Sequence, residues 1–346
     1  NLHVLNYSTP INKEIEFKNL KKHIFTLPSL PNAIPYVTSY YKKNWGFCLK
    51  DNVRKKINKK EKFKVLVDTK FKNGYLNYGE FFKKGKVSSE IVFSTNICHP
   101  SLGNNELSGI LVSTALSKYL ETINSYYSYR IIFVPETIGA LCFLKKNIKN
   151  LKKIKAGFVL SCLGDNKNFS ILHSPYQNNY ADKVAKFNYD YNKFKYKSFS
   201  YLKRGSDERQ YCSPRFNLPF CTLTRTRFGD FKEYHTSLDN LNFITPKGLD
   251  KSFKMISSLI KVIENNKVYL SNIKGEPFLM KYNLKNEISG FNKPLKKDTT
   301  TILDLIAYSN GKNDLIDISK YIKKDFLYLS KVAQKLEKLK IIKSIN

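Results

Sequence analysis

Two histidines and several carboxylates stand beside apolar runs of the chain, each in a short polar segment. Those that could do chemistry together are His99, Glu136, Asp165, Asp207 and His235. Imidazole and carboxylate groups bind zinc, an open position on the metal holds water, and a further carboxylate can take the proton of that water. Each residue taken alone is more often solvated than catalytic, so the hypothesis of a metal-dependent hydrolase requires a fold that brings them together.

His99 lies between a predicted strand and a predicted helix. Residues 90–97 are a β-branched and aromatic run, which is typical of a buried strand. Residues 110–120 carry apolar side chains at helical spacing. A polar loop at the carboxyl end of a strand is where open α/β sheets bind ligands. The same pattern also fits an ordinary strand–helix connection with one solvated histidine.

The middle of the chain, from 89 to 270, alternates predicted strands and helices. Alternation of this kind predicts a mostly parallel sheet with helices on both faces. The strands are expected at 129–134, 157–162 and 218–225, and the helices at 138–149 and 246–266.

The two ends of the chain differ from this middle part. Residues 1–88 predict a small β-rich lobe, in which Asn73-Gly74 stands between two β-prone runs and indicates a hairpin over 63–82. Residues 271–297 are expected to be a connector. Residues 298–346 hold three helical patterns, an order typical of a helix-turn-helix or winged-helix module. Nine Lys and six acidic residues give that module a net charge of only +3, which favours a structural or protein-contact role over DNA binding.

The whole chain has a formal net charge of +32. A strongly basic chain usually suggests a nucleic-acid partner. Here Lys is scattered along the entire length, and Arg, which is favoured for bidentate phosphate contacts, is scarce. We therefore attribute the charge to composition, expect no nucleic-acid partner, and retain a preference for an anionic substrate.

Three absences bear on the compartment. No run of about 18 apolar residues occurs, so no membrane span is expected. The six cysteines form no CxxC pair, and several lie in apolar runs, as in reduced proteins of the cytoplasm. The sequence begins at Asn1, and no charged-then-apolar leader follows. We therefore expect a cytoplasmic location.

Several stretches resemble the aminopeptidase-like proteins of bacterial surface-polysaccharide gene clusters. These proteins are relatives of zinc-dependent aminopeptidases and glutamate carboxypeptidases, with a small β-domain and a C-terminal winged helix. The resemblance implies the same architecture here, a zinc aminopeptidase-like α/β domain with both additions. The matching stretches are IPYVTSYYKKNWGFCL, ICHPSLGNNELSG, VPETIG, GSDERQYCSP, YHTSLDNL and KGEPFLMKYNL.

The resemblance also implies roles for single residues. His99 and His235 match the first and last metal-binding histidines, and Glu136 matches the general base. Asn105 falls where the related enzymes have an Asp that bridges two zinc ions. Other positions depart from the pattern as well: Thr137 and Ser161 stand where ligand carboxylates are expected, and Ser101 stands where an Asp orients the first histidine.

These departures favour one zinc ion over two, because a neutral Asn oxygen is a poor bridge between two dications. The ligands would then be His99, His235 and one carboxylate, from Glu136, Asp165 or Asp207. The segment 204–214 is expected to lie around the substrate, with Arg209 suited to a carboxylate or phosphate group. An internal salt-bridge network is the alternative for that segment. The expected substrate-binding residues are Asn105, Asp207, Glu208 and Arg209.

The leading hypothesis is a zinc-dependent hydrolase of an amide bond in a small-molecule or peptide-like substrate, within surface-polysaccharide or nucleotide-sugar metabolism. The first alternative is a catalytically inactive binding protein that kept the fold. The second is a nucleic-acid-binding regulator that uses the C-terminal module. The formation of homo-oligomers is left open.

Two kinds of nucleophilic catalysis are not expected. The chain has no GxSxG motif, the sequence signature of a nucleophile elbow, so a Ser-His-Asp triad is not expected. A Cys98 nucleophile beside His99 is disfavoured, because neighbouring residues at a strand end tend to point to opposite faces.

Overall fold

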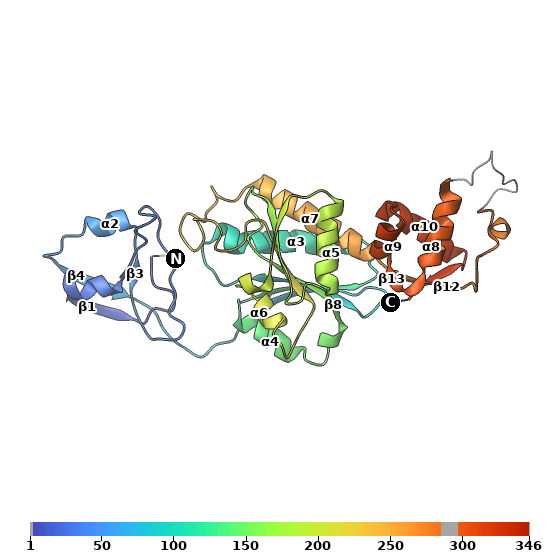
Figure 1. Cartoon of the computed structure of the whole chain (residues 1–346). Helices are drawn as coiled ribbons and strands as arrows, with labels where there is room; N and C mark the ends of the chain where they lie inside the picture. Colours follow the sequence, from blue (N-terminus) through green and yellow to red (C-terminus); the bar gives the residue numbers. More distant parts are fainter. Residues whose placement is uncertain (1–2, 285–296, 346) are drawn as a thin grey trace. The chain divides into compact units, whose positions relative to one another are not determined.

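The computed structural model describes residues 3–284 and 297–345, which form two compact units over Asn1–Ser257 and Ser258–Asn346. Figure 1 traces the chain through both units. The first unit holds a small N-terminal lobe and a large sheet covered by helices. The second unit is a small helical module. Of the connector expected at 271–297, residues 285–296 lie outside the described part.

The N-terminal lobe consists of two small sheets and short helices. Strand β1 (Ile11–Glu16) is antiparallel to β4 (Lys62–Val67), and β2 (Ile24–Phe25) is parallel to β3 (Phe47–Cys48). The helical segments are α1 (Phe17–Leu20), η1 (Lys21–His23) and α2 (Asp51–Lys55).

The hairpin predicted over 63–82 is wrong. Strand β4 pairs with β1, and the second β-prone run forms β5 (Gly79–Lys83), which pairs with β7 of the large sheet. Pairing with distant strands buries Val65 and Val67 of β4. A local Asn-Gly turn would not provide this burial, so tertiary packing overrides the turn propensity.

Within the described residues the large sheet has seven strands, in the order β10-β9-β11-β8-β6-β7-β5. Strands β6, β7, β8 and β11 run parallel, whereas β5 and β9 are antiparallel to their neighbours β7 and β11, and β10 follows β9. This mostly parallel order confirms the predicted fold class. The bounds are β6 Glu90–Asn96, β7 Ser128–Val134, β8 Ile154–Leu160, β9 Phe169–Leu172, β10 Tyr196–Phe199 and β11 Phe220–Thr224.

Helices cover both faces of this sheet. Figure 1 shows α3 and α7 on one face and α4 and α6 on the other. The ring of Tyr119 in α3 contacts Phe253 in α7, and Asn188 of α5 donates a hydrogen bond to a carbonyl of α7. The bounds are α3 Ser108–Thr122, α4 Ile138–Lys146, α5 Tyr180–Tyr191, α6 Glu208–Tyr211 and α7 Pro246–Asn265, with short turns η3 Leu151–Lys153 and η4 Tyr201–Lys203.

The C-terminal unit contains the three predicted helices and a small sheet in the order β13-β12-β14. Its middle strand β12 (Val268–Ser271) precedes the first of these helices, although those residues were expected at the end of the α/β domain and the start of the connector. The other elements are η5 Leu279–Tyr282, α8 Lys297–Tyr308, β13 Asn310–Asp314, α9 Leu315–Tyr321, α10 Phe326–Lys338 and β14 Ile342–Ser344.

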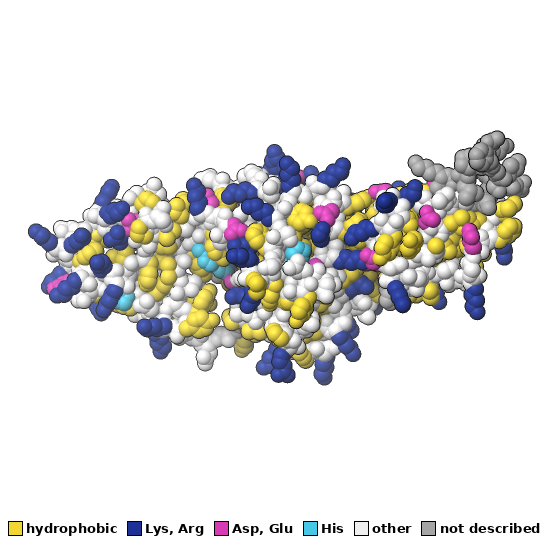
Figure 2. Space-filling view, viewed as in Figure 1, with side chains coloured by type: hydrophobic (Ala, Val, Ile, Leu, Met, Phe, Trp, Pro, Cys, Tyr) yellow, Lys and Arg dark blue, Asp and Glu magenta, His cyan; other side chains and the backbone are white. Residues whose placement is uncertain are grey.

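The basic side chains are dispersed over the face seen in Figure 2, rather than gathered into one patch. This distribution agrees with a charge that comes from composition. In the part of the chain that the structure describes, no helix combines the length and the apolar character needed to cross a membrane.

The centre of the sheet is an aromatic stack, and its loss should weaken the whole first unit. Phe93 of β6 is fully buried, with its ring centroid 5.4 Å from that of Phe158 and 6.5 Å from that of Tyr129. We expect Phe93→Ala to lower the free energy of unfolding by about 3–5 kcal/mol in urea titration. The same substitution at Phe71, which is 65% exposed, should cost less than about 0.5 kcal/mol. Equal effects of the two variants would contradict this assignment of the core.

Candidate metal and catalytic site

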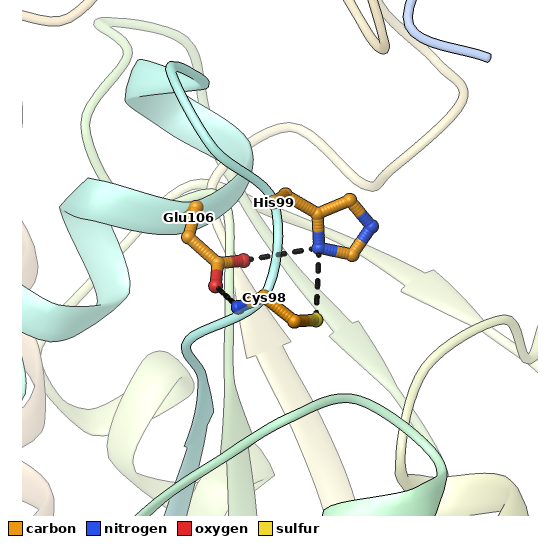
Figure 3. Close-up of side chains that lie close together, drawn as sticks. All are labelled: Cys98, His99 and Glu106. Carbon is orange, nitrogen blue, oxygen red and sulfur yellow. Dashed lines mark hydrogen bonds and ion pairs between the residues drawn. The ribbon is translucent and has the colours of Figure 1, made fainter. Parts of the chain in front are cut away.

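His99 follows strand β6 and is buried between two carboxylates. Its Nδ1 lies 3.2 Å from Oε2 of Glu106, and its Nε2 lies 3.7 Å from Oε2 of Glu136. Figure 3 shows the Glu106 carboxylate turned toward the imidazole. Burial lowers the pKa of His99, but the contacts with Cys98 and Glu106 outweigh burial and raise it above the usual value. Because Nδ1 is already occupied, Nε2 is the nitrogen that is left for a ligand.

Cys98 also faces the imidazole, with its sulfur 3.3 Å from Nδ1 of His99 (Figure 3). The prediction that the two side chains point apart is wrong, because β6 ends at Asn96 and strand alternation does not extend to them. Cys98 and Glu106 contact the same ring nitrogen, so they cannot be the two ends of a relay through the ring. The potential ligand atoms of Cys98, His99 and Glu106 all lie within 4.8 Å of one another, which is a second way to hold a metal.

The π-helical turn η2 (Gly103–Leu107) places Asn105 and Glu106, and a distant carboxylate holds this turn. The backbone N–H groups of Asn104 and Asn105 donate to the Asp239 carboxylate at 2.5 and 2.9 Å. The N–H of Gly103 donates to the carbonyl of the same residue at 2.9 Å. Asp239 is fully buried, and burial raises its pKa although the two amides oppose that effect.

His235 lies where the N-terminal lobe contacts the α/β domain. Ile34 and Ser237 exchange two hydrogen bonds, and the N–H of Tyr36 donates to the carbonyl of His235 at 2.8 Å. The Tyr36 ring lies 5.3 Å from the His99 ring and 5.2 Å from the His235 ring, between centroids. Burial, and secondarily the charge of His99, lower the pKa of His235 to about 4. The lobe therefore supplies an aromatic wall beside the two histidines.

The two histidines converge, with ring centroids 5.2 Å apart. Two imidazoles on one tetrahedral zinc, with Zn–N bonds of about 2 Å, would have their centroids about 5 Å apart. Nε2 of His235 and Oδ1 of Asn105 are buried without a hydrogen-bond partner. Buried polar atoms without partners are costly, and a bound cation would satisfy them. The separation of the two imidazoles therefore fits a shared metal ion, whereas the group of three ligand atoms that the described residues bring within 4.8 Å of one another is that of Cys98, His99 and Glu106.

Asp207 and Glu136 lie on another side of this site. Asp207 is fully buried, its Oδ1 accepts the Thr137 N–H at 2.7 Å, and its Oδ2 has no hydrogen-bond partner. Burial, partly opposed by the Thr137 N–H, raises the pKa of Asp207 to about 8. Thr137 itself has a left-handed φ of 67°, a strained conformation for a β-branched residue.

Glu136 stands between His99 and Arg209. Its Oε1 lies 3.8 Å from Nη2 of Arg209, which also donates to the Thr137 hydroxyl at 3.3 Å. Burial raises the pKa of Glu136, whereas the charges of His99 and Arg209 lower it. The Arg209 side chain is 40% exposed, so part of the guanidinium remains accessible to a ligand.

Two of the expected site residues are engaged elsewhere. The Asp165 carboxylate accepts hydrogen bonds from the backbone of Lys167 and Thr226 and from the side chain of Asn104, at 2.7–3.2 Å. The Glu208 carboxylate accepts from two amides of its own loop, at 2.7 and 2.9 Å, and from the Thr222 hydroxyl at 3.0 Å. Both carboxylates stabilise loops, so we assign neither of them to the metal or to the substrate.

Two further residues at the site, Glu106 and Tyr36, were not among those expected from the sequence. Both stand inside stretches that carry the resemblance, which is the signal that could have pointed to them. Their roles depend on the π-helical turn and on the contact between lobe and domain, neither of which local sequence patterns specify.

Comparison with known proteins identifies the family. Residues 4–266 match the model of a family described as a domain of unknown function (DUF4910), and residues 267–344 match a winged helix-turn-helix family. The chain belongs to the DUF4910 family. It is also 36% identical, over its entire length and 79% of the relative, to a Clostridium acetobutylicum protein named "Putative polysaccharide biosynthesis protein with aminopeptidase-like domain". The resemblance found in the sequence is therefore confirmed.

Solved structures agree with this family. A crystal structure of a "putative peptidase" from Clostridium acetobutylicum matches 100% of this chain and 78% of its own, with 35% identity and a TM-score of 0.88. A zinc aminopeptidase from Bacillus subtilis, BSAP, matches 68% of this chain and 62% of its own, with 16% identity and a TM-score of 0.55. At that identity the second match shows the aminopeptidase-like fold alone.

Removing the Asp239 charge should destabilise the turn that carries Asn105 and Glu106. In Asp239→Asn the charged acceptor is lost, and the side-chain NH₂ group can face the backbone N–H groups of Asn104 and Asn105, which are donors as well. Because the site is buried, we expect a loss of about 1.5–3 kcal/mol in the free energy of unfolding. Asp230→Asn is the matched control, because Asp230 forms a partly exposed pair with Arg227 and should cost less than about 1 kcal/mol. A smaller loss for Asp239→Asn than for the control in urea titration would show that Asp239 does not hold the turn.

Proposed function

We propose that this chain is a zinc-dependent hydrolase of an amide bond, with one zinc ion held by His99 and His235. The observation that carries the proposal is the convergence of the two imidazoles, 5.2 Å apart between centroids, with Nε2 of His235 buried and unpartnered. Zinc prefers such nitrogen ligands, and catalytic sites keep one position open for water.

Two further oxygens are buried without a hydrogen-bond partner and are candidates for additional contacts with the metal. They are Oδ1 of Asn105 and Oδ2 of Asp207. Of these two groups only Asp207 can carry a negative charge, and a bound dication would favour its ionised form over the neutral form that burial favours, so we assign it as the carboxylate ligand. Asn105, Thr137 and Ser161 are neutral where the related enzymes have carboxylates. A site with so little negative charge suits one cation rather than two.

Glu136 is the proposed general base. When bound, zinc supplies a Lewis acid that polarises the substrate carbonyl and makes water more acidic. The Glu136 carboxylate, beside Nε2 of His99, accepts the proton of the attacking water and then donates it to the leaving amine. Glu106 accepts a hydrogen bond from Nδ1 of His99, which fixes the ring and its tautomer.

The substrate class follows from the surroundings and from the relative's name. Arg209 reaches the site with a partly exposed guanidinium, which suits a carboxylate or phosphate on the substrate. The Clostridium relative is named for polysaccharide biosynthesis. We therefore place the substrate among peptide-like or sugar-linked amides that carry an anionic group.

One alternative is favoured by a specific observation. The neutral residues Asn105, Thr137 and Ser161 would also fit a binding protein that kept the fold without catalysis. Such a protein would bind the same class of ligand and hold no metal, so metal content separates the two functions.

The first prediction of this proposal concerns metal content. Protein purified without chelator or affinity metal should contain about one zinc per chain by elemental analysis. The double variant His99→Ala, His235→Ala should lose the zinc, because it removes both nitrogen ligands. The matched double variant His3→Ala, His23→Ala should retain it.

Cys98→Ala separates the two metal positions available to His99. Retention of zinc in Cys98→Ala supports binding through Nε2, and loss would point to the Cys98, His99 and Glu106 group. Absence of zinc from the wild type, even after incubation with zinc, would exclude the hydrolase and leave the binding protein.

The two glutamates beside His99 should respond differently to the same substitution. Glu106→Gln should weaken zinc affinity about 10- to 100-fold, because it removes the carboxylate that orients the ligand. Glu136→Gln should leave zinc affinity within a few-fold of the wild type and slow amide hydrolysis about 100-fold or more. Chelator competition measures the affinity, and a panel of aminoacyl and N-acyl-sugar amides measures the rate. The reverse pattern would exchange the two assigned roles.

A further inference from the structure

A second cluster of reactive side chains lies outside the site described above. His173 directly follows strand β9, Asp182 lies in the first turn of α5, and Ser198 lies in strand β10. Nε2 of His173 is 2.9 Å from Oγ of Ser198, and Nδ1 is 2.8 Å from Oδ1 of Asp182. The two contacts use the two different nitrogens of one imidazole, as a relay from hydroxyl to carboxylate requires.

The surroundings of Asp182 fix the direction of this relay. Asp182 already accepts a hydrogen bond from the N–H of Ser174 at 3.1 Å and another from the Ser174 hydroxyl. An ionised carboxylate only accepts hydrogen bonds, so Nδ1 of His173 carries the proton in that contact. In the neutral ring Nε2 is then unprotonated, and it accepts a hydrogen bond from the Ser198 hydroxyl.

A nucleophile must be accessible to its substrate, whereas the base and the carboxylate that orients it can be buried. His173 and Asp182 are 5% and 2% exposed, whereas Ser198 is exposed. Strand β10 stands at the end of the strand order, so one side of Ser198 faces no neighbouring strand among the described residues. Strands β9 and β10 run opposite to β6, β7, β8 and β11, so their carboxyl ends point away from the strand ends that carry His99 and Glu136.

We propose that Ser198, His173 and Asp182 form a second reactive centre, in which Ser198 is a nucleophile toward acyl esters. Oγ of Ser198 forms a bond to the acyl carbon, and its proton moves to Nε2 of His173. The ester C–O bond then breaks, and the leaving alcohol takes that proton. Water releases the acyl group by the same route, again through His173 as base and then acid. Asp182 holds the ring in the required tautomer throughout.

This cluster changes one conclusion drawn from the sequence. The absence of a GxSxG elbow argued against a Ser-His-Asp triad, but a triad is defined by geometry and not by one motif. The members come in the chain order His, Asp, Ser, from three separate elements. No short sequence motif could therefore have identified these three residues.

The test is covalent labelling of the full-length protein with a fluorescent fluorophosphonate. Oγ of Ser198 attacks phosphorus, fluoride leaves, and His173 takes the proton. The wild type should be labelled at Ser198, located by peptide mass spectrometry, and Ser198→Ala should not be labelled. Ser200→Ala is the matched control, since Ser200 is exposed two residues away, and it should be labelled at the wild-type rate.

His173→Gln should slow the labelling about 100-fold or more, because a general base contributes that much. Should that buried variant fail to fold, wild-type protein unfolded in urea replaces it as the comparison, and it should likewise be labelled at least 100-fold more slowly. Equal labelling of the wild type and Ser198→Ala would overturn the proposal. So would labelling of Ser198 that does not depend on His173 or on the folded state.

Discussion

A carboxylate removed from water must find hydrogen-bond donors inside the protein, and Asp239 finds them in the backbone of a turn that lies 135 residues earlier in the chain. The π-helical turn η2 is the local conformation that aims those amides at it. That turn in turn sets the positions of Asn105 and Glu106, and through Glu106 the orientation of His99. Strand β6 brings His99 to the carboxyl end of the parallel strands, and the distant carboxylate, through Glu106, orients its ring.

The N-terminal lobe is part of the site for the same reason. Its backbone pairs with the segment around His235, and its Tyr36 ring lies against both histidines. Enclosure by the lobe keeps water from His235 and so favours the neutral imidazole, the form that binds a metal. Enclosure also leaves Nε2 of His235 and Oδ1 of Asn105 buried without a hydrogen-bond partner. A bound cation would offset the free-energy cost of burying these two atoms.

The parts of the fold that could be predicted are those with long, strongly patterned segments. The seven-residue strands β6, β7 and β8 were expected from their apolar runs, and α7 was expected over 246–266, close to its observed bounds. The segment β9–α5–β10 was not expected, because four-residue strands carry too few residues to show a period. Its His173, Asp182 and Ser198 were missed with it.

The residues of the candidate site also fall into those that the sequence could predict and those that it could not. Sequence order and family resemblance pointed to His99 and His235, and the fold does bring them together. They could not show that Asp165 and Glu208 are engaged by nearby donors, since a carboxylate in a loop looks the same whether it is engaged or free. The contact of Cys98 with His99 was misjudged because strand geometry was extended to His99, beyond Asn96, where β6 ends.

The middle strand of the C-terminal sheet, β12, comes before the module's first helix, and this affects how the protein can be dissected. A fragment cut at 298, where the helical pattern starts, would leave β13 and β14 without the strand that joins them. Two unpaired edges would then face solvent, which favours aggregation over folding. A fragment from 267 onward keeps that strand, so this longer piece is the one with which partners of the module, whether protein or nucleic acid, can be sought.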